Sequence, residues 1–235
     1  MNTVEQVDMQ EEFVVPSGAS VILPYEYERE YFIEPVEKLE KKIVYSFVKR
    51  LIDITASLCA LIVFAIPMLI VAVAIKLDSK GPVLYFQERL GLNGEPFDCI
   101  KFRSMRTDAE SNGAQWSAGD EDPRITKVGR VIRKYRLDEL PQFFLTLTGK
   151  MTLVGPRPER ACFYQEFENY IHGFSQRLMV KPGFTGLAQV NGGYDLRPEE
   201  KIVYDMEYIK TRSLWLDIKI LFKTVKVVFC GKSAK

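Results

Sequence analysis

Residues 54–75 read ITASLCALIVFAIPMLIVAVAI, and this stretch decides the organisation of the chain because none of its side chains carries a formal charge. A helix of about 20 apolar residues is long enough to cross the hydrocarbon core of a bilayer. A buried helix of a soluble protein is the weaker interpretation, since such helices are commonly shorter. The stretch therefore predicts a helix embedded in a membrane.

Pro67 lies slightly past the middle of this stretch, where it removes a backbone hydrogen bond and can bend a helix sharply. Lysine and arginine are enriched on the cytoplasmic side of membrane helices. Here they flank both ends, as Lys41, Lys42, Lys49, Arg50, Lys76 and Lys80. Both ends therefore look cytoplasmic, which favours a re-entrant helix broken at Pro67; a helix that spans the bilayer stays open as the alternative.

The residues before this stretch differ in charge from those after it. Residues 1–46 hold ten Asp or Glu and four Lys or Arg, whereas residues 47–235 hold 21 acidic and 28 basic side chains. We expect an acidic N-terminal extension over 1–45, loosely structured apart from a short strand over 20–23. The membrane segment is placed at 46–80 and a cytosol-facing domain at 81–235. The net charge of +1 does not indicate nucleic-acid binding, while a basic body suits an anionic substrate or membrane surface.

Patterns after residue 80 predict an α+β fold, in which a compact body of amphipathic helices carries a small β-hairpin. The hairpin is expected at 83–87 and 97–102, around the turn-forming Asn93-Gly94. Loops are expected over 107–122 and 181–193, and helices over 126–136, 138–147, 159–171, 198–211 and 214–229. The last helix places Lys219, Lys223 and Lys226 on one face. It either lies in a membrane interface or packs on the body, and the sequence leaves both open.

Two adjacent acids, Asp138 and Glu139, form the candidate reactive centre. Neighbouring side chains on a helix diverge by about 100°, so these two cannot share one proton. That arrangement suits two different roles, in which one carboxylate attacks a phosphorus atom or binds a metal and the other handles a proton or completes the metal shell. Taken alone, the pair also fits acids in the first turn of a helix, where the dipole favours negative charge.

Basic side chains crowd the same third of the chain and favour a phosphate substrate. Arg157 lies between Pro156 and Pro158, which stiffen its backbone, and a guanidinium group can bind phosphate oxygens in pairs. The other members are Lys101, Arg103, Arg106, Arg124, Lys127, Arg130, Arg133 and Arg136. Cations beside two acids are the usual equipment of phosphoryl transfer. A zinc site of the usual kind is excluded, since His172 is the only histidine and the four cysteines are far apart.

Four collinear motifs resemble the bacterial sugar transferases, the small monotopic phosphoglycosyl transferases that act on polyprenyl phosphate. They are KFRSM at 101–105, LDELPQ at 137–142, VGPRPE at 154–159 and KPGFTG at 181–186. The resemblance covers about residues 46–230. It implies a membrane enzyme of a bacterial inner or plasma membrane, with its catalytic domain facing the cytoplasm and its membrane segment re-entrant.

The resemblance also implies a ping-pong reaction. Asp138 would attack the sugar-bearing phosphorus of a UDP-sugar, release UMP and pass the sugar phosphate to undecaprenyl phosphate, the initiating step of exopolysaccharide or capsule synthesis. Magnesium would be held by Asp138 or Glu139 together with substrate oxygens. Glu139 would assist the metal or deprotonate the lipid phosphate. The basic phosphate contacts fall on Lys101, Arg103, Arg133 and Arg157.

Two positions depart from the family pattern. The family breaks its membrane helix at a Ser-Pro pair, whereas this chain has Ile66-Pro67, so the break would depend on Pro67 alone. Gly193 follows Asn191-Gly192 where some relatives carry arginine, which bears on sugar choice. The identity of the sugar stays open, as do protein partners such as a second copy or polysaccharide assembly proteins. A non-catalytic scaffold of an assembly complex is the alternative function.

Overall fold

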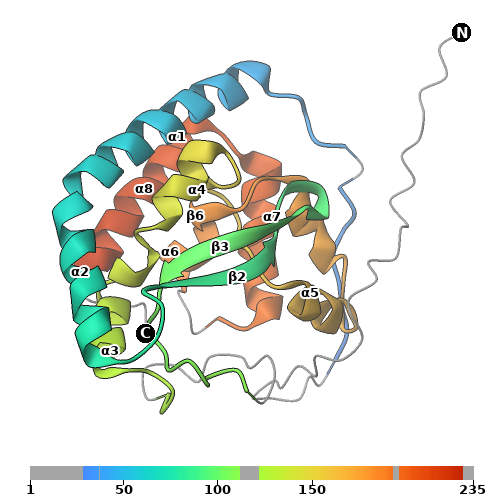
Figure 1. The fold of residues 1–235 in the computed structure, drawn as a ribbon. Coiled ribbons are helices and arrows are strands. Elements are labelled where there is room, and N and C mark those ends of the chain that lie inside the picture. Colours follow the sequence, from blue (N-terminus) through green and yellow to red (C-terminus); the bar gives the residue numbers. More distant parts are fainter. Residues whose placement is uncertain (1–28, 37, 112–121, 193–195, 230–235) are drawn as a thin grey trace, which may run out of the picture.

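The computed structural model describes residues 29–36, 38–111, 122–192 and 196–229. The strand expected at 20–23, most of the loop expected at 107–122, and Gly193 lie outside these ranges. The described elements form the mixed helical and stranded body that the sequence predicts (Figure 1). In order they are β1 (Tyr31–Phe32), α1 (Ile43–Val63), α2 (Ala65–Asp78), β2 (Leu84–Leu90), η1 (Leu92–Gly94), β3 (Pro96–Phe102), α3 (Lys127–Lys134), η2 (Leu137–Glu139), α4 (Gln142–Thr148), β4 (Thr152–Val154), α5 (Ala161–Glu168), β5 (Ile171–His172), η3 (Phe174–Met179), β6 (Gly183–Thr185), α6 (Leu187–Asn191), α7 (Pro198–Thr211) and α8 (Leu214–Phe229).

Helices α1 and α2 form one long bent rod along an edge of the molecule (Figure 1). Within the described residues no single helix is both long and apolar enough to cross a bilayer, whereas the two together reach that length and composition with a bend of 59°. The interruption falls at Phe64, and Pro67 lies in the first turn of α2, where it cannot donate to the carbonyl of Val63. The bend therefore begins three residues before the proline.

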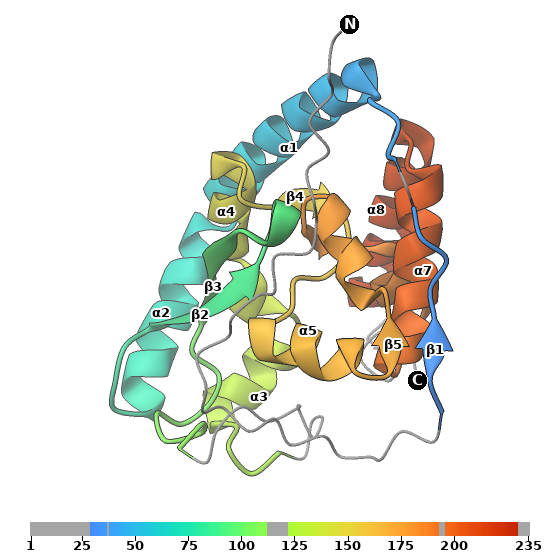
Figure 2. The ribbon, with the colours of Figure 1, turned by 90° about the vertical axis from the view of Figure 1, so that its right-hand side faces the viewer.

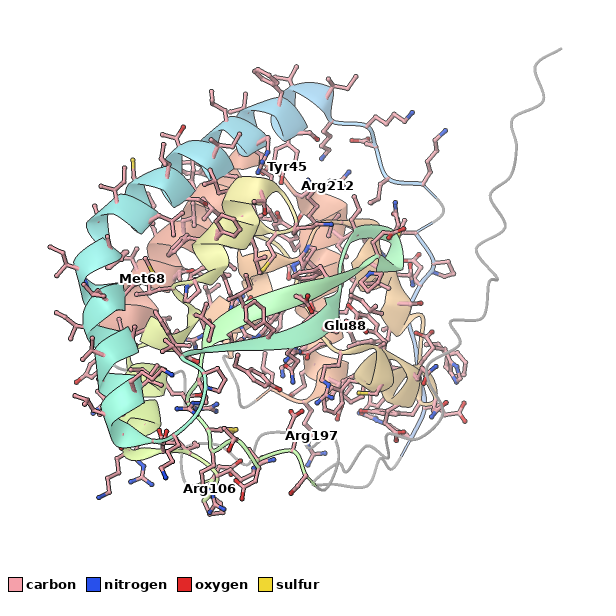
Figure 3. The ribbon with its side chains drawn as sticks, viewed as in Figure 1. Tyr45, Met68, Glu88, Arg106, Arg197 and Arg212 are labelled. Atoms are coloured by element: carbon pink, nitrogen blue, oxygen red, sulfur yellow. The ribbon has the colours of Figure 1, made fainter. Side chains whose placement is uncertain are left out.

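The outward side of this rod is apolar, and Figure 3 shows its side chains projecting away from the body while Met68 points inward. Leu77 is 84% exposed and Ile43 is 76% exposed. The other exposed apolar side chains of the rod are Val44, Phe47, Leu51, Ile52, Leu58, Ile62, Val63, Phe64, Ile66, Leu69, Ile70 and Val73. A contiguous apolar surface of this size is unusual on a monomeric soluble protein and marks an interaction surface.

The inward side of α1 is polar and binds the body by hydrogen bonds. Thr152 Oγ1 and the backbone N–H of Leu153 donate to the Asp53 carboxylate at 2.7 and 2.9 Å. The Arg50 guanidinium donates to the carbonyls of Thr146 and Leu147 at 2.7 and 2.8 Å, which satisfies the C-terminal end of α4. Helix α1 is therefore bound firmly to the packed body and also carries the apolar surface.

The main core lies beneath α5, α7 and α8, where aromatic and branched side chains pack around fully buried Tyr170, Phe167, Phe174, Ile202 and Ile209. Strands β2 and β3 pair antiparallel from Leu84↔Phe102 to Leu90↔Pro96. Figure 2 shows this hairpin on one side of the body and α7 and α8 on the other. The hairpin and both last helices occur where the sequence predicts them, and the predicted bounds of α7 and α8 are confirmed.

Three predictions about local structure differ from the structure. The helix expected over 138–147 begins as the 3₁₀ turn η2, and α4 starts only at Gln142. The segment 181–193, expected as a loop because of its glycines, contains strand β6 and helix α6, and β6 pairs in parallel with β4. The helix expected over 159–171 ends at Glu168, and Ile171 belongs to β5. In the last two places short strands pair with segments distant in sequence, so no local pattern signals them.

Candidate functional site

The adjacent acids lie on η2, a single 3₁₀ turn between α3 and α4. Arg136 precedes it in a left-handed conformation with φ of 54°, which turns the chain away from α3. Leu140 then enters a core cluster with Ile75 and Phe102, so the turn is fixed from α2 and β3. A 3₁₀ turn separates neighbouring side chains by about 120°, slightly more than the α-helix that the sequence predicted.

Glu139 is the paired carboxylate of the two. Its Oε1 accepts a hydrogen bond from Arg157 Nη2 and lies 3.4 Å from Lys101 Nζ, and its side chain is 3% exposed. Burial alone would raise its pKa, but the charges of Arg157 and Lys101 and the Arg157 hydrogen bond outweigh burial and hold the pKa below its usual value. Glu139 is therefore a fixed anion between two cations.

Asp138 is buried like Glu139, but the groups that act on its charge have a different net effect. Burial, followed by repulsion from the Glu139 carboxylate, raises the pKa of Asp138 to about 6, against the lowering effect of Lys101, Arg133 and Arg157. Among the described residues, none is found to donate a hydrogen bond to this carboxylate. A carboxylate without hydrogen-bond donors keeps its lone pairs available for a reacting atom or a metal.

Three of the four predicted phosphate contacts meet at the acidic pair. Lys101 comes from β3, Arg133 from the last turn of α3 and Arg157 from the loop after β4, and the charge of each acts on Asp138. Segments that are far apart in sequence thus bring three cations to one point, as a phosphate-binding site requires.

Arg103 lies elsewhere. It is 5% exposed, and its guanidinium donates to the carbonyls of Lys80 and Ser79 at 2.5 and 2.8 Å and to Ser79 Oγ at 3.0 Å. These bonds hold the chain where α2 ends, and Gly81, at φ 127°, is required there because a Cβ would lie 2.0 Å from Arg103 Nη1. The geometry gives Arg103 the position of an anchor between α2 and β3, and its predicted phosphate contact stays a prediction.

The remaining basic residues are partly accounted for by local pairs. Arg106 pairs with Asp108 on the surface, at the edge of the molecule where Figure 3 labels it. Arg124 binds the buried carboxylate of Asp122 at 2.5 Å. Such pairs reduce the number of cations available to a substrate.

The loop that carries Arg157 is held against β6 by a close backbone approach. A Cβ on Gly155 would lie 2.5 Å from the carbonyl oxygen of Lys181, and one on Gly183 would lie 2.1 Å from the backbone nitrogen of Gly155. Glycine at both positions lets the VGPRPE and KPGFTG motifs pack side by side. The second motif therefore supports the first, a structural role that the sequence alone did not reveal.

The carboxylates of the acidic pair suit magnesium only if waters and substrate phosphates supply the remaining ligands. No group of three or more His, Cys, Asp or Glu gathers into a metal cage in the part of the chain that the structure describes. Magnesium is commonly bound through one or two carboxylates, with waters and substrate phosphates completing six ligands. Asp138, which accepts no hydrogen bond from the residues that the structure describes, fits that role, and Glu139 is beside it but engaged by Arg157 and Lys101.

A buried acidic pair among converging cations, on a body that carries an exposed apolar helix pair, defines a phosphate-handling protein with an extensive apolar interaction surface. Residues 44–231 match the family model described as "Bacterial sugar transferase", and the chain belongs to this family.

Curated relatives in the family are similar over most of this chain. A UDP-N-acetylgalactosamine-undecaprenyl-phosphate N-acetylgalactosaminephosphotransferase of Aeromonas hydrophila is 47% identical over 82% of this chain and 46% of its own length. A UDP-glucose:undecaprenyl-phosphate glucose-1-phosphate transferase of Klebsiella pneumoniae is 45% identical over 79% and 41%. An undecaprenyl-phosphate galactose phosphotransferase of Salmonella typhimurium is 42% identical over 77% and 40%. The chain thus spans less than half the length of these relatives.

Proposed function

We propose that this protein transfers a sugar 1-phosphate from a UDP-sugar to undecaprenyl phosphate, giving undecaprenyl-diphosphate-sugar and UMP. The observation that carries this proposal is the division of roles within the acidic pair. Asp138 has a raised pKa and no hydrogen-bond donor among the described residues, while Glu139 is fixed by Arg157 and Lys101. The names of the relatives, which are undecaprenyl-phosphate sugar phosphotransferases, support the same reaction.

The first half-reaction uses Asp138 as the nucleophile. Its carboxylate oxygen bonds to the phosphorus that carries the sugar, and the bond from that phosphorus to the oxygen bridging to UMP breaks, so UMP leaves with the electron pair. A pKa of about 6 leaves Asp138 mainly ionised near neutral pH, yet more basic and more nucleophilic than an ordinary aspartate. Lys101, Arg133 and Arg157 stabilise the negative charge that develops on the phosphate oxygens.

The second half-reaction regenerates the enzyme. An oxygen of undecaprenyl phosphate attacks the phosphorus of the sugar-phosphoryl aspartate, and the bond to Asp138 breaks, which restores the carboxylate. Glu139 orients Arg157, and because its pKa is held below its usual value it stays an anion, so the lipid phosphate reacts in its doubly ionised form. When bound at Asp138 and Glu139, magnesium would supply positive charge that offsets the charge of the diphosphate. The sugar stays attached to its phosphate throughout.

The lipid substrate accounts for the apolar surface of the α1–α2 rod. We propose that the rod enters the membrane and returns by the same face, so that the catalytic body remains on the cytoplasmic side. Residues 46–80 would then form the membrane segment, residues 81–235 the catalytic domain and residues 1–45 an extension. Helix α8 adds exposed Trp215, Ile218, Phe222 and Val225, which suit a membrane interface beside the rod.

The test of this function measures UMP released from a set of UDP-sugars with undecaprenyl phosphate and magnesium. Asp138→Asn removes the nucleophile and should abolish release, and Glu139→Gln should leave about 1% or less. Asp98→Asn is the matched control, because Asp98 is an exposed carboxylate on the strand that carries Lys101. Full activity of Asp138→Asn would contradict the mechanism.

Exchange of labelled UMP into the UDP-sugar distinguishes an enzyme from a scaffold. A covalent intermediate predicts magnesium-dependent exchange without any lipid acceptor, because the first half-reaction is reversible. No exchange and no turnover with any UDP-sugar would favour the non-catalytic scaffold. The same set of UDP-sugars identifies the sugar, since the relatives act on three different ones at similar identity to this chain.

A further inference from the structure

The loop after β4 is held by its carbonyl groups. Five of the six carbonyls between residues 154 and 159 accept a hydrogen bond from another part of the molecule. The donors are Lys49 Nζ and Tyr208 Oη to Val154 at 2.9 Å each, Gly183 N to Pro156 at 2.8 Å, Arg177 Nη2 to Arg157 at 2.8 Å, Arg89 Nη1 to Pro158 at 3.0 Å and Leu90 N to Glu159 at 3.0 Å.

Two prolines in this loop make its position depend on the hydrogen bonds that its carbonyls accept. Pro156 and Pro158 have no backbone N–H, so the loop cannot be fixed by the usual pairing of donors and acceptors along a strand. Its path beside Arg157 depends on side chains that donate to carbonyls. Two of these donors are arginines on consecutive carbonyls, Arg177 on residue 157 and Arg89 on residue 158.

Arg177 is held rigidly from behind. Its Nε donates to Asp205 at 2.7 Å, and both side chains are 2% exposed. Its guanidinium carbon also lies 4.8 Å from the centre of the Phe174 ring, within cation–π distance. A carboxylate from α7 and a ring from η3 thus fix the direction in which Nη2 points.

Arg89 is fixed in a similar way from the hairpin. The same Nη1 that donates to the Pro158 carbonyl also donates to Glu159 Oε2 at 2.8 Å, and Nη2 donates to Gln87 Oε1 at 2.5 Å. Burying two arginines is costly unless each has a carboxylate partner, and both have one.

We propose that Arg89 and Arg177 are positioning residues, a carbonyl clamp that sets where the Arg157 guanidinium meets Glu139 and the phosphate of the substrate. This inference rests on the proposed function for its kinetic consequence but not for its geometry. The clamp touches neither acid in the described contacts, so it acts through Arg157. An error of about 1 Å in the position of such a group can lower a rate by roughly 100-fold.

The test uses lysine variants, which keep the charge but lose the fork of donors. Arg177→Lys can retain the contact with Asp205 but cannot also reach the Arg157 carbonyl, and Arg89→Lys loses one of its partners in the same way. Arg50→Lys is the matched control, since Arg50 also donates to two consecutive carbonyls, at the end of α4. Unfolding midpoints show which variants fold, and Arg89→Lys carries the test if the more buried Arg177→Lys does not.

The kinetic arm is a double-mutant cycle with Arg157→Lys, measured as kcat/KM for the UDP-sugar. We expect each clamp variant to lower kcat/KM by about 10- to 100-fold, mainly through kcat, and to add less than about twofold once Arg157 is lysine. Arg50→Lys should combine with Arg157→Lys additively. Additive losses for the clamp variants would overturn the proposal, because they would show an effect that does not pass through Arg157.

A second arm does not depend on activity. The guanidinium NMR signal of Arg157, assigned by its loss in Arg157→Lys, should report slow side-chain rotation while the ion pair with Glu139 holds. The signal should report fast rotation of the Arg157 guanidinium in Arg177→Lys and Arg89→Lys, and slow rotation in Arg50→Lys. A slow signal in the clamp variants would overturn the clamp even if the enzyme is active. Absent turnover in the wild type, with the NMR result as expected, would instead count against the proposed function alone.

Discussion

At the scale of single residues, the site separates two neighbouring carboxylates by their surroundings. Both acids are buried, yet the pKa of Asp138 is raised by burial and by the charge of Glu139. The pKa of Glu139 is lowered, because the charges of Arg157 and Lys101 and the Arg157 hydrogen bond outweigh its burial. The sequence singled out the two acids and the three cations that lie together, Lys101, Arg133 and Arg157, but it also included Arg103, which lies elsewhere. It could not predict that Arg157 pairs with Glu139, nor the roles of Arg89 and Arg177, since these contacts join residues that no local pattern connects.

Arg103→Met distinguishes an anchor from a phosphate ligand. We expect lower stability, by on the order of 1–3 kcal/mol, because the carbonyls of Ser79 and Lys80 lose their donor. The KM for the UDP-sugar should change little in the protein that remains folded. Chemical unfolding gives the first quantity and initial rates of UMP release the second. A large rise in KM without loss of stability would restore the phosphate contact predicted from the sequence.

Glu159 gives a pH dependence of stability. Burial would raise its pKa, but the charges of Arg89 and then Lys201, Arg177 and Arg157 hold the pKa below its ordinary value of 4.5 in the folded protein. A lowered pKa stabilises the fold above pH 4.5, and this contribution is lost as the pH falls through the folded pKa. The unfolding midpoint of the wild type should therefore fall more steeply below pH 4.5 than that of Glu159→Gln. Parallel curves for the two proteins would contradict this assignment.

At the scale of elements, the signals that are local in sequence predicted best. Pro198 with acids after it begins α7, and the Asn93-Gly94 turn centres the hairpin, so both follow from neighbouring residues. The parallel pair of β4 and β6 was missed because each strand has only three residues and their partners are about 30 positions apart. The bend of the rod was predicted near Pro67 but begins at Phe64, since a proline disturbs the turn before it.

Side chains on the polar side of α1 connect the rod to the loop that carries Arg157. Lys49 Nζ lies 2.8 Å from the Asp217 carboxylate of α8 and donates to the Val154 carbonyl, while Tyr45 donates to the same carboxylate at 3.0 Å. Helix α1 of the rod and the start of the Arg157 loop therefore share one hydrogen-bond network. The apolar composition of residues 54–75 gave no sign of it, because Tyr45 and Lys49 precede that stretch.

The path of the rod through the membrane is tested with single cysteines at Val48 and Ser79, introduced after replacement of the native cysteines. A re-entrant rod brings both positions to one face, so an impermeant maleimide should label both from the cytoplasmic side of inverted vesicles. Intact vesicles of the opposite orientation should protect both. Labelling of the two positions from opposite sides would establish a spanning helix and reject the re-entrant proposal.

At the scale of the whole molecule, the acidic pair with its cations, the apolar rod and α8 belong to one packed body, and the relatives extend well beyond it. The family resemblance predicted from four motifs is confirmed by the match over residues 44–231. The choice of sugar could not be predicted, since relatives at 42–47% identity are named for three different sugars and no motif separates them.

On the re-entrant path proposed for the rod, the 59° bend would have a consequence for the lipid around the protein. A rod that enters and leaves the membrane by the same side adds volume to one leaflet and none to the other. It therefore favours a membrane that is convex on the side where the body of the protein lies. Reconstituted chain should therefore accumulate on small vesicles over large ones at equal lipid area. Equal amounts of protein per lipid area on small and large vesicles would show that the rod affects the two leaflets alike. The bend that shapes the helix pair would thus also bias where on a curved membrane the protein is found.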